Sequence, residues 1–174
     1  MTAARPKRKQ YRAPAAGLAA LLAALGLAVC AVVALPLTPL RAAVSAPIVV
    51  DWHTGLAISG YDPVAFFTDG KPVAGSANLE LQYGGVTWRF SNVGNRAAFV
   101  DDPDVYMPQY GGYDPVGVAR NVAVAGNPAV WLIAGERLYL FYDGARRDQF
   151  AAEPARFISA ADRAWPAVKS SLGP

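Results

Sequence analysis

The stretch Gly60-Tyr61-Asp62-Pro63-Val64-Ala65-Phe66-Phe67 organises this chain, because its first five residues return as Gly112-Tyr113-Asp114-Pro115-Val116. Aspartate is a favourable N-cap residue and proline is favoured at the first helical position, so each copy predicts a short helix. In the first copy this helix is expected over residues 64–67. If Asp62 and Asp114 are caps, asparagine should replace either with little loss, because it caps about as well.

The two copies also permit a functional interpretation. Equivalent turns that lie side by side would bring two carboxylates, Asp62 and Asp114, and two phenols, Tyr61 and Tyr113, to one place. Paired carboxylates can bind a hard cation such as calcium, or share a proton. These four residues are therefore the candidate ligand-binding residues, and no residue is assigned a catalytic role.

Alternating apolar and polar residues predict two β-hairpins. Residues 79–83 and 86–90 flank a Gly-Gly pair, which is typical of a two-residue hairpin loop. Residues 130–133 and 137–142 form a second alternating pair around a turn that contains glycine. Residues 116–124 are compatible with either a strand or a short helix.

Helices are expected after each hairpin. One begins at Ser91 or Asn92, a second covers residues 145–150, and a third runs from Pro154 until Pro166. The expected fold is therefore a small single α+β domain with two β-hairpins and several short helices.

The N-terminal part of the chain has the pattern of a membrane anchor. Residues 13–40 contain no charged residue, and their apolar run is long enough to cross a hydrocarbon core of about 30 Å. Basic residues precede this run and favour a cytoplasmic location for that end. The expected organisation is a cytoplasmic basic tip at 1–13, one transmembrane signal-anchor helix at 14–35, a linker at 36–50 and a domain at 51–174.

This organisation predicts a single-pass protein of the cytoplasmic membrane whose C-terminal domain is periplasmic. The alternative is a signal peptide that is cleaved near Ala46 and a secreted domain, although Pro47 should hinder that cleavage. The only cysteine, Cys30, lies in the apolar segment, so the exported domain would have no disulfide and no thiol ligand.

The charge distribution excludes nucleic acid as a partner. Six of the 16 basic residues precede Pro47, while all 13 acidic residues follow it, so the remainder has a net charge of −3. A nucleic-acid-binding domain would need a basic face. The membrane is the expected partner of the N-terminal helix, and its basic flank suits anionic lipid.

Several motifs between residues 56 and 166 together resemble those of YHS-domain proteins. They are the segments 60–67, 70–73, 88–91, 95–96, 108–113, 138–140 and 165–166. Some members of that family are metal-binding modules, and the resemblance implies that their cysteines correspond to Ala65, Ser91 and Asn95. Exported members often have another cysteine where this chain has Asp114. Because every soft ligand is replaced, the resemblance implies the fold but not the metal site.

His53 and Ser91 are weaker candidates for site residues. His53 is the only histidine, and without further nitrogen or sulfur ligands it does not make a zinc or copper site, so no metal and no cofactor are expected. Ser91 would be a nucleophile only with His53 and an acid beside it, and helix capping is its expected role.

These observations predict a membrane-anchored, extracytoplasmic YHS-like binding module for a small ligand or a partner protein, with no catalysis. The first alternative is an enzyme or a hard-cation site that uses Asp62 and Asp114. A weaker alternative is a degenerate metal-binding module.

Overall fold

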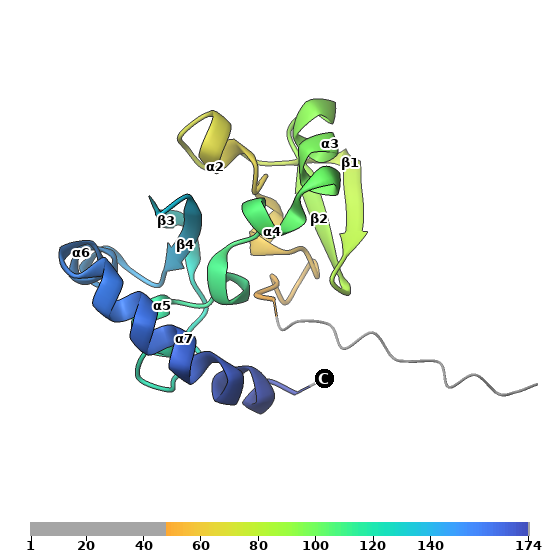
Figure 1. Ribbon diagram of the computed structural model, residues 1–174. Helices are drawn as coiled ribbons and strands as arrows, with labels where there is room; N and C mark the ends of the chain where they lie inside the picture. The colour runs from red at the N-terminus through yellow and green to blue at the C-terminus, as the bar shows by residue number, and fades with distance from the viewer. Residues whose placement is uncertain (1–47, 174) are drawn as a thin grey trace, which may run out of the picture. The chain divides into compact units, whose positions relative to one another are not determined.

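Two antiparallel hairpins and several helices make up the part of the chain that the computed structural model describes, residues 48–173 (Figure 1). The predicted α+β class is confirmed for these residues. The predicted basic tip, transmembrane helix and most of the linker lie outside them. Within residues 48–173, no helix is both long enough and apolar enough to cross a membrane.

The first half of the domain, residues 58–106, is built around the first predicted hairpin. Its elements are η1 (Ile58–Gly60), α2 (Ala65–Thr68), β1 (Ser76–Tyr83), β2 (Val86–Phe90), α3 (Val93–Asp101) and α4 (Pro103–Tyr106). The hairpin is confirmed, and β1 begins earlier than predicted because a register shift between Ser76 and Glu80 lengthens it. We refer to this half as the first repeat.

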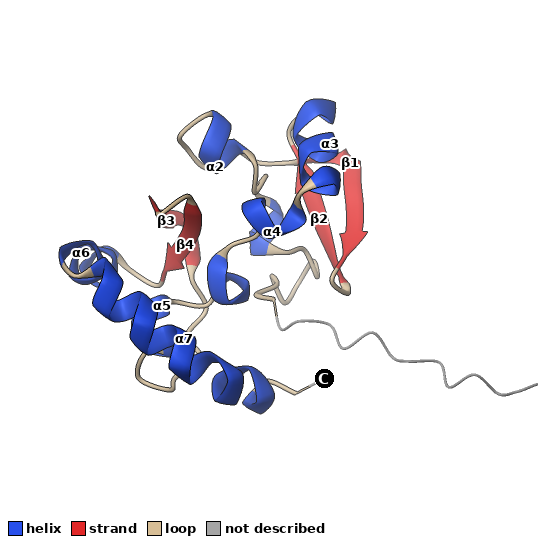
Figure 2. Ribbon diagram, in the orientation of Figure 1, coloured by secondary structure: helices blue, strands red, loops and turns tan. Residues whose placement is uncertain are grey.

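The second half, residues 109–171, contains the same elements in the same order. They are η2 (Gln109–Gly112), α5 (Pro115–Val118), β3 (Asn127–Ala134), β4 (Arg137–Phe141), α6 (Gly144–Ala152) and α7 (Pro154–Ser171). The second predicted hairpin is confirmed, with a register shift between Asn127 and Trp131. We refer to this half as the second repeat, and Figure 2 shows the two hairpins as separate pairs of strands.

The similarity of the two repeats extends to backbone details. Two residues before the first glycine of each motif, a residue other than glycine has a left-handed conformation, Ile58 with φ 43° and Tyr110 with φ 54°. The helix after each hairpin is capped by a side chain, that of Asn92 for α3 and that of Asp143 for α6. The five-residue repeat in the sequence therefore marks a duplicated structural unit.

Strand β4 lies between two hydrophobic cores. Successive side chains of a strand point to opposite faces. Leu138 and Leu140 accordingly belong to the first core, whereas Tyr139 and Phe141 belong to the second, and all four are buried. Because β4 contributes to both cores, the second hairpin joins the two repeats.

The face of the hairpin that carries Leu138 and Leu140 differs between the repeats. In the second repeat its cross-strand pairs are apolar: Trp131 with Leu140 and Ile133 with Leu138. In the first repeat the equivalent pairs are polar: Glu80 with Arg89 and Gln82 with Thr87. Phe66 of the first repeat packs against the apolar face, with its ring 5.3 Å from that of Trp131. The first repeat thus covers this face of the second hairpin, whereas the equivalent face of the first hairpin remains polar.

A glycine ends the turn that leads into each hairpin, at Gly75 and Gly126, because backbone segments approach closely there. A Cβ atom on Gly126 would lie 2.7 Å from the Gly112 carbonyl oxygen and 2.7 Å from the Leu140 Cβ. Distances this short exclude a side chain, so glycine is required where the turn crosses the hairpin.

Two details of the helix prediction were wrong. Helix α7 does not stop at Pro166 but continues to Ser171. Pro166 lies on the exposed side, whereas Phe157, Ala161 and Val168 continue one buried stripe across it, and this burial offsets the missing hydrogen bond of the proline.

The second detail concerns Ser91. Capping was its expected role, but Asn92 caps α3 by accepting a hydrogen bond from the Asn95 N–H at 2.8 Å. The Ser91 side chain instead points to Asp62, as described below.

Candidate functional site

Asp62 lies at the centre of a polar network within the first repeat, and its side chain is fully buried. Its Oδ1 accepts hydrogen bonds from the backbone N–H groups of Val64 (2.9 Å) and Ala65 (3.4 Å). Its Oδ2 accepts from the Ser91 N–H (2.8 Å), the Ser91 hydroxyl (2.7 Å) and the Asn95 side-chain amide (2.7 Å). The carboxylate therefore holds the start of α2 against the end of β2 and the first turn of α3.

Asp114 has the same position in the second repeat and is also fully buried. Its Oδ1 accepts hydrogen bonds from the N–H groups of Val116 (2.8 Å) and Gly117 (3.0 Å) at the start of α5. Its Oδ2 accepts one from the Tyr142 N–H (2.9 Å), and the Arg146 Nη1 lies 3.6 Å away. An arginine here takes the place of the asparagine in the first repeat.

Each aspartate thus caps a short helix and also binds the end of a distant strand. All the hydrogen bonds that Asp62 and Asp114 accept come from their own repeat, and within residues 48–173 no hydrogen bond or ion pair joins the two carboxylates. The arrangement supports the fold of each repeat separately.

Tyr61 and Tyr113, the other two candidate residues, pack against different cores. Tyr61 is partly buried against the first core, and Tyr113 against the second, where its ring lies 6.2 Å from that of Trp165. Burial raises the pKa of Tyr113 above its ordinary value. The structure therefore places the two phenols in separate surroundings.

The three positions at which the YHS resemblance implies cysteine do converge, because Ala65, Ser91 and Asn95 all donate hydrogen bonds to Asp62. These groups are donors rather than metal ligands, and they occupy both oxygens of the carboxylate. Residues 48–173 contain no cluster of three or more histidine, cysteine, aspartate or glutamate side chains that could hold a metal ion. The residues present do not fit a metal ion at this position.

His53 lies in an exposed loop with its ring against that of Trp52, the two centroids being 3.3 Å apart. Its backbone N–H, rather than its imidazole, contacts Asp51 Oδ1 at 3.0 Å. Hydrogen bonds, of which the one from the Thr54 N–H is the strongest influence, lower the pKa of Asp51. This carboxylate shapes the loop that presents Trp52.

A buried tyrosine with a carboxylate partner, which the sequence did not single out, lies between η2 and α7. The Tyr110 hydroxyl donates a hydrogen bond to Asp162 Oδ1 at 2.8 Å, and the residue is 7% exposed. Desolvation, together with the hydrogen bond to Asp162, raises the pKa of Tyr110 far above its ordinary value. The phenol is therefore neutral in the folded protein throughout the physiological range.

Alkaline pH is expected to destabilise the domain through Tyr110. Because its pKa is raised in the folded state, the neutral phenol contributes stability that is fully present below the unfolded-state pKa of about 10 and is lost as the pH rises above that value. Thermal unfolding at a series of pH values should show the midpoint falling above pH ~10. Tyr110→Phe should cost about 1 kcal/mol at neutral pH and should make the alkaline fall shallower. An unchanged alkaline slope in the phenylalanine variant would contradict this assignment.

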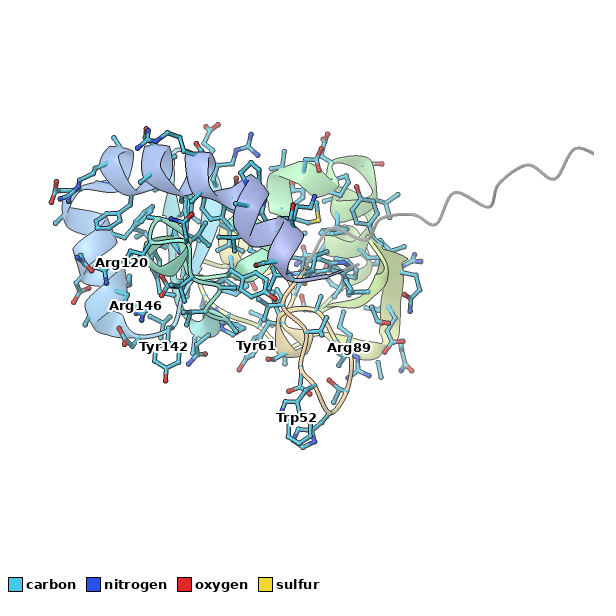
Figure 3. The ribbon with its side chains drawn as sticks, turned by 90° about the horizontal axis from the view of Figure 1, so that it is seen from below. Trp52, Tyr61, Arg89, Arg120, Tyr142 and Arg146 are labelled. Atoms are coloured by element: carbon cyan, nitrogen blue, oxygen red, sulfur yellow. The ribbon has the colours of Figure 1, made fainter. Side chains whose placement is uncertain are left out.

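Aromatic and arginine side chains that are exposed or partly exposed lie along one edge of the domain. Figure 3 shows this edge, which we call the aromatic–arginine edge and which consists of Trp52, Tyr61, Arg89, Arg120, Tyr142 and Arg146. Trp52 is 84% exposed and Tyr142 is 58% exposed, both unusually high values for large aromatic side chains. Of these residues the sequence analysis singled out only Tyr61, because nothing in the local pattern indicated that Trp52 and Tyr142 would be exposed.

A sequence signal for part of this edge does exist. When the repeats are aligned through their hairpins, Ser91 and Asn95 correspond to Tyr142 and Arg146, so two residues that bind a buried aspartate become surface residues. Comparisons with protein families, with curated proteins and with solved structures found no match to this chain.

Proposed function

We propose that the chain is a membrane-anchored, extracytoplasmic YHS-like binding module, which binds a small ligand or a partner protein through the aromatic–arginine edge and catalyses no reaction. The observation that carries this proposal is the exposure of Trp52 and Tyr142 on the edge that also holds three arginines. Tryptophan, tyrosine and arginine are the residues most enriched at binding hot spots. In this proposal the uncharged segment 14–35 anchors the chain and the edge contacts the ligand.

The buried aspartates argue against the catalytic and hard-cation alternatives. Asp62 accepts five hydrogen bonds from neutral donors, so both of its oxygens are already engaged. Asp114 accepts three and lies next to a guanidinium. A cation or a substrate proton would have to displace these donors, at a cost of about 1–3 kcal/mol for each buried group left unpaired.

Membrane fractionation and cross-linking in intact cells test the two parts of the proposal separately. A full chain with a C-terminal tag should remain in the membrane pellet after a carbonate wash, and release of a shortened soluble form would contradict the anchor.

For binding, the tagged parent chain is compared with Trp52→Ala combined with Tyr142→Ala, and with Val93→Ser as a control on α3. Val93 is 73% exposed and is not one of the six residues that define the aromatic–arginine edge.

The expected result is a defined cross-linked species that the parent and the control share and that the double variant loses. A species of equal yield in all three chains would place the binding surface elsewhere. Thermal unfolding of the three purified chains checks that the loss does not come from unfolding, because truncation of exposed side chains usually changes stability by about 0.5 kcal/mol or less.

A further inference from the structure

The two repeats satisfy their buried aspartates in different ways. In the first repeat, Ser91 and Asn95 supply neutral donors and no cation is present beside Asp62. In the second repeat, the guanidinium of Arg146 lies beside Asp114. The fold can therefore satisfy this aspartate without a cation, and Arg146 stands where the first repeat has the neutral donor Asn95.

Arg146 is held in place by two contacts but keeps its hydrogen-bonding capacity. Its Nη1 lies 3.6 Å from Asp114 Oδ2, and its guanidinium carbon lies 5.5 Å from the centre of the Tyr142 ring. Its side chain is 31% exposed, and within residues 48–173 the guanidinium donates no hydrogen bond. A guanidinium has five N–H donors, so Arg146 presents N–H donors at the surface while its contacts with Asp114 and Tyr142 hold it in place.

A second arginine reaches the same helix. Arg120 lies in the turn after α5, and its Nη2 is 3.5 Å from Gln149 Oε1 on α6. Gln149 is three residues after Arg146, so the two share one side of the helix. Helix α5, which precedes this turn, also lies against Arg146, because a Cβ atom on Gly117 would be 3.4 Å from the Arg146 Nη1. In the view of Figure 3, Arg120, Arg146 and Tyr142 lie on the same side of the domain, and the Arg146–Tyr142 contact joins two of them.

We propose that Arg146, Arg120 and Tyr142 form a binding site for a phosphate group, a role that rests on the proposed function of the aromatic–arginine edge. Guanidinium groups bind phosphate oxygens through paired, charge-assisted hydrogen bonds, and a phenol hydroxyl adds one donor. The positive charges of the two arginines balance the carboxylates of Asp114 and Asp143, and Asp114 is fully buried, so the guanidinium N–H groups are the charged groups that can contact a phosphate at the surface. The nearby carboxylate of Asp143 is engaged as the cap of α6, where its Oδ1 accepts from the Arg146 N–H at 2.9 Å.

The test is titration of the purified full chain with inorganic phosphate at constant ionic strength, followed by isothermal calorimetry and thermal unfolding. Arg146→Gln and Arg120→Gln should each weaken phosphate binding by about tenfold or more, because each removes charge-assisted hydrogen bonds. Arg147→Gln is the matched control. It removes the same charge from the next residue of α6, where Arg147 pairs with Asp148 at 2.8 Å.

Weakened binding in both variants and unchanged binding in the control would support the site. The proposal is overturned if millimolar phosphate does not bind the parent chain, or if Arg147→Gln loses as much affinity as the two variants. Should Arg146→Gln fail to fold, Arg120→Gln decides the outcome, because Arg120 does not contact Asp114.

A second arm of the experiment identifies the source of the phosphate. The full chain is placed in nanodiscs of neutral lipid, with or without phosphatidic acid, and phosphate is titrated again. Loss of phosphate binding only with phosphatidic acid would identify a lipid headgroup as the occupant, and persistent binding would identify a soluble phosphate compound. Phosphate titration reports on this inference, whereas cross-linking in intact cells reports on the proposed binding function, so the failure of one is distinguishable from the failure of the other.

Discussion

Replacing Leu140 with arginine is expected to abolish folding of the domain. Leu140 is fully buried on the face of β4 that the first repeat covers. An uncompensated buried charge costs about 3–5 kcal/mol, and the lost burial of the leucine adds about 1.5–3 kcal/mol. Since natural domains are stable by about 5–15 kcal/mol, this variant should show no cooperative unfolding transition.

The reciprocal variant is the control. Arg89 occupies the equivalent position in the first repeat, where its side chain is 30% exposed and pairs with Glu80 at 2.9 Å. Arg89→Leu should therefore change stability by about 1 kcal/mol or less. Circular dichroism during thermal unfolding compares the two variants. Equal stability of Leu140→Arg and Arg89→Leu would contradict the arrangement in which the first repeat covers the second.

Asp62→Asn is expected to lower the free energy of unfolding by about 3 kcal/mol or more, because an amide cannot accept hydrogen bonds on both sides. Either orientation of the asparagine directs its NH₂ group at buried donors. In one orientation the NH₂ group faces the N–H groups at the start of α2, and in the other it faces the donors of Ser91 and Asn95. The expectation that asparagine would replace this aspartate with little loss does not allow for the second set of donors.

Asp114→Asn should cost less than Asp62→Asn. Its Oδ2 accepts only one hydrogen bond, from the Tyr142 N–H, and the partly exposed Arg146 can turn towards solvent. Urea unfolding of the two purified variants compares the losses. A larger loss for Asp114→Asn would show that its ion pair with Arg146 outweighs the neutral network around Asp62.

The local elements of the fold were predictable because they depend on neighbouring residues. Alternation and a Gly-Gly turn define the first hairpin, and an Asp-Pro pair defines the start of each short helix. The end of α7 was not predictable in this way, since Pro166 is tolerated only because the stripe that includes Val168 remains buried beyond it.

The sequence analysis recognised the five-residue motif but not the extent of the duplication. Outside the motif, identical residues recur at scattered positions, such as Gly75 and Gly126 or Phe99 and Phe150, whereas other equivalent positions share a backbone role alone, as Asn92 and Asp143 do as caps. The polar and apolar versions of the same hairpin face show why: the surroundings of the two repeats differ, so their side chains diverged.

The sequence pattern also identified Asp62 and Asp114 as candidate residues, but it did not predict which distant groups donate hydrogen bonds to them. Their capping bonds are local, whereas the bonds from Ser91 and Tyr142 cross 29 and 28 positions of the chain. Contacts between residues so far apart in the sequence depend on the tertiary packing of the hairpin, and a local sequence pattern does not predict that packing. The aromatic–arginine edge was missed for a similar reason, because exposure is a property of the assembled domain.

The central claim is that the two aspartates support separate repeats and do not form a shared site. The most direct test is the thermal unfolding of Asp62→Asn, Asp114→Asn and the double variant, with and without calcium. Among residues 48–173 the aspartates share no hydrogen-bond partner, so both single variants should be destabilised, their losses should add within about 0.5 kcal/mol, and calcium should change nothing. Facing carboxylates repel each other, so a single variant more stable than the parent, or a calcium-dependent shift that either variant loses, would contradict the claim.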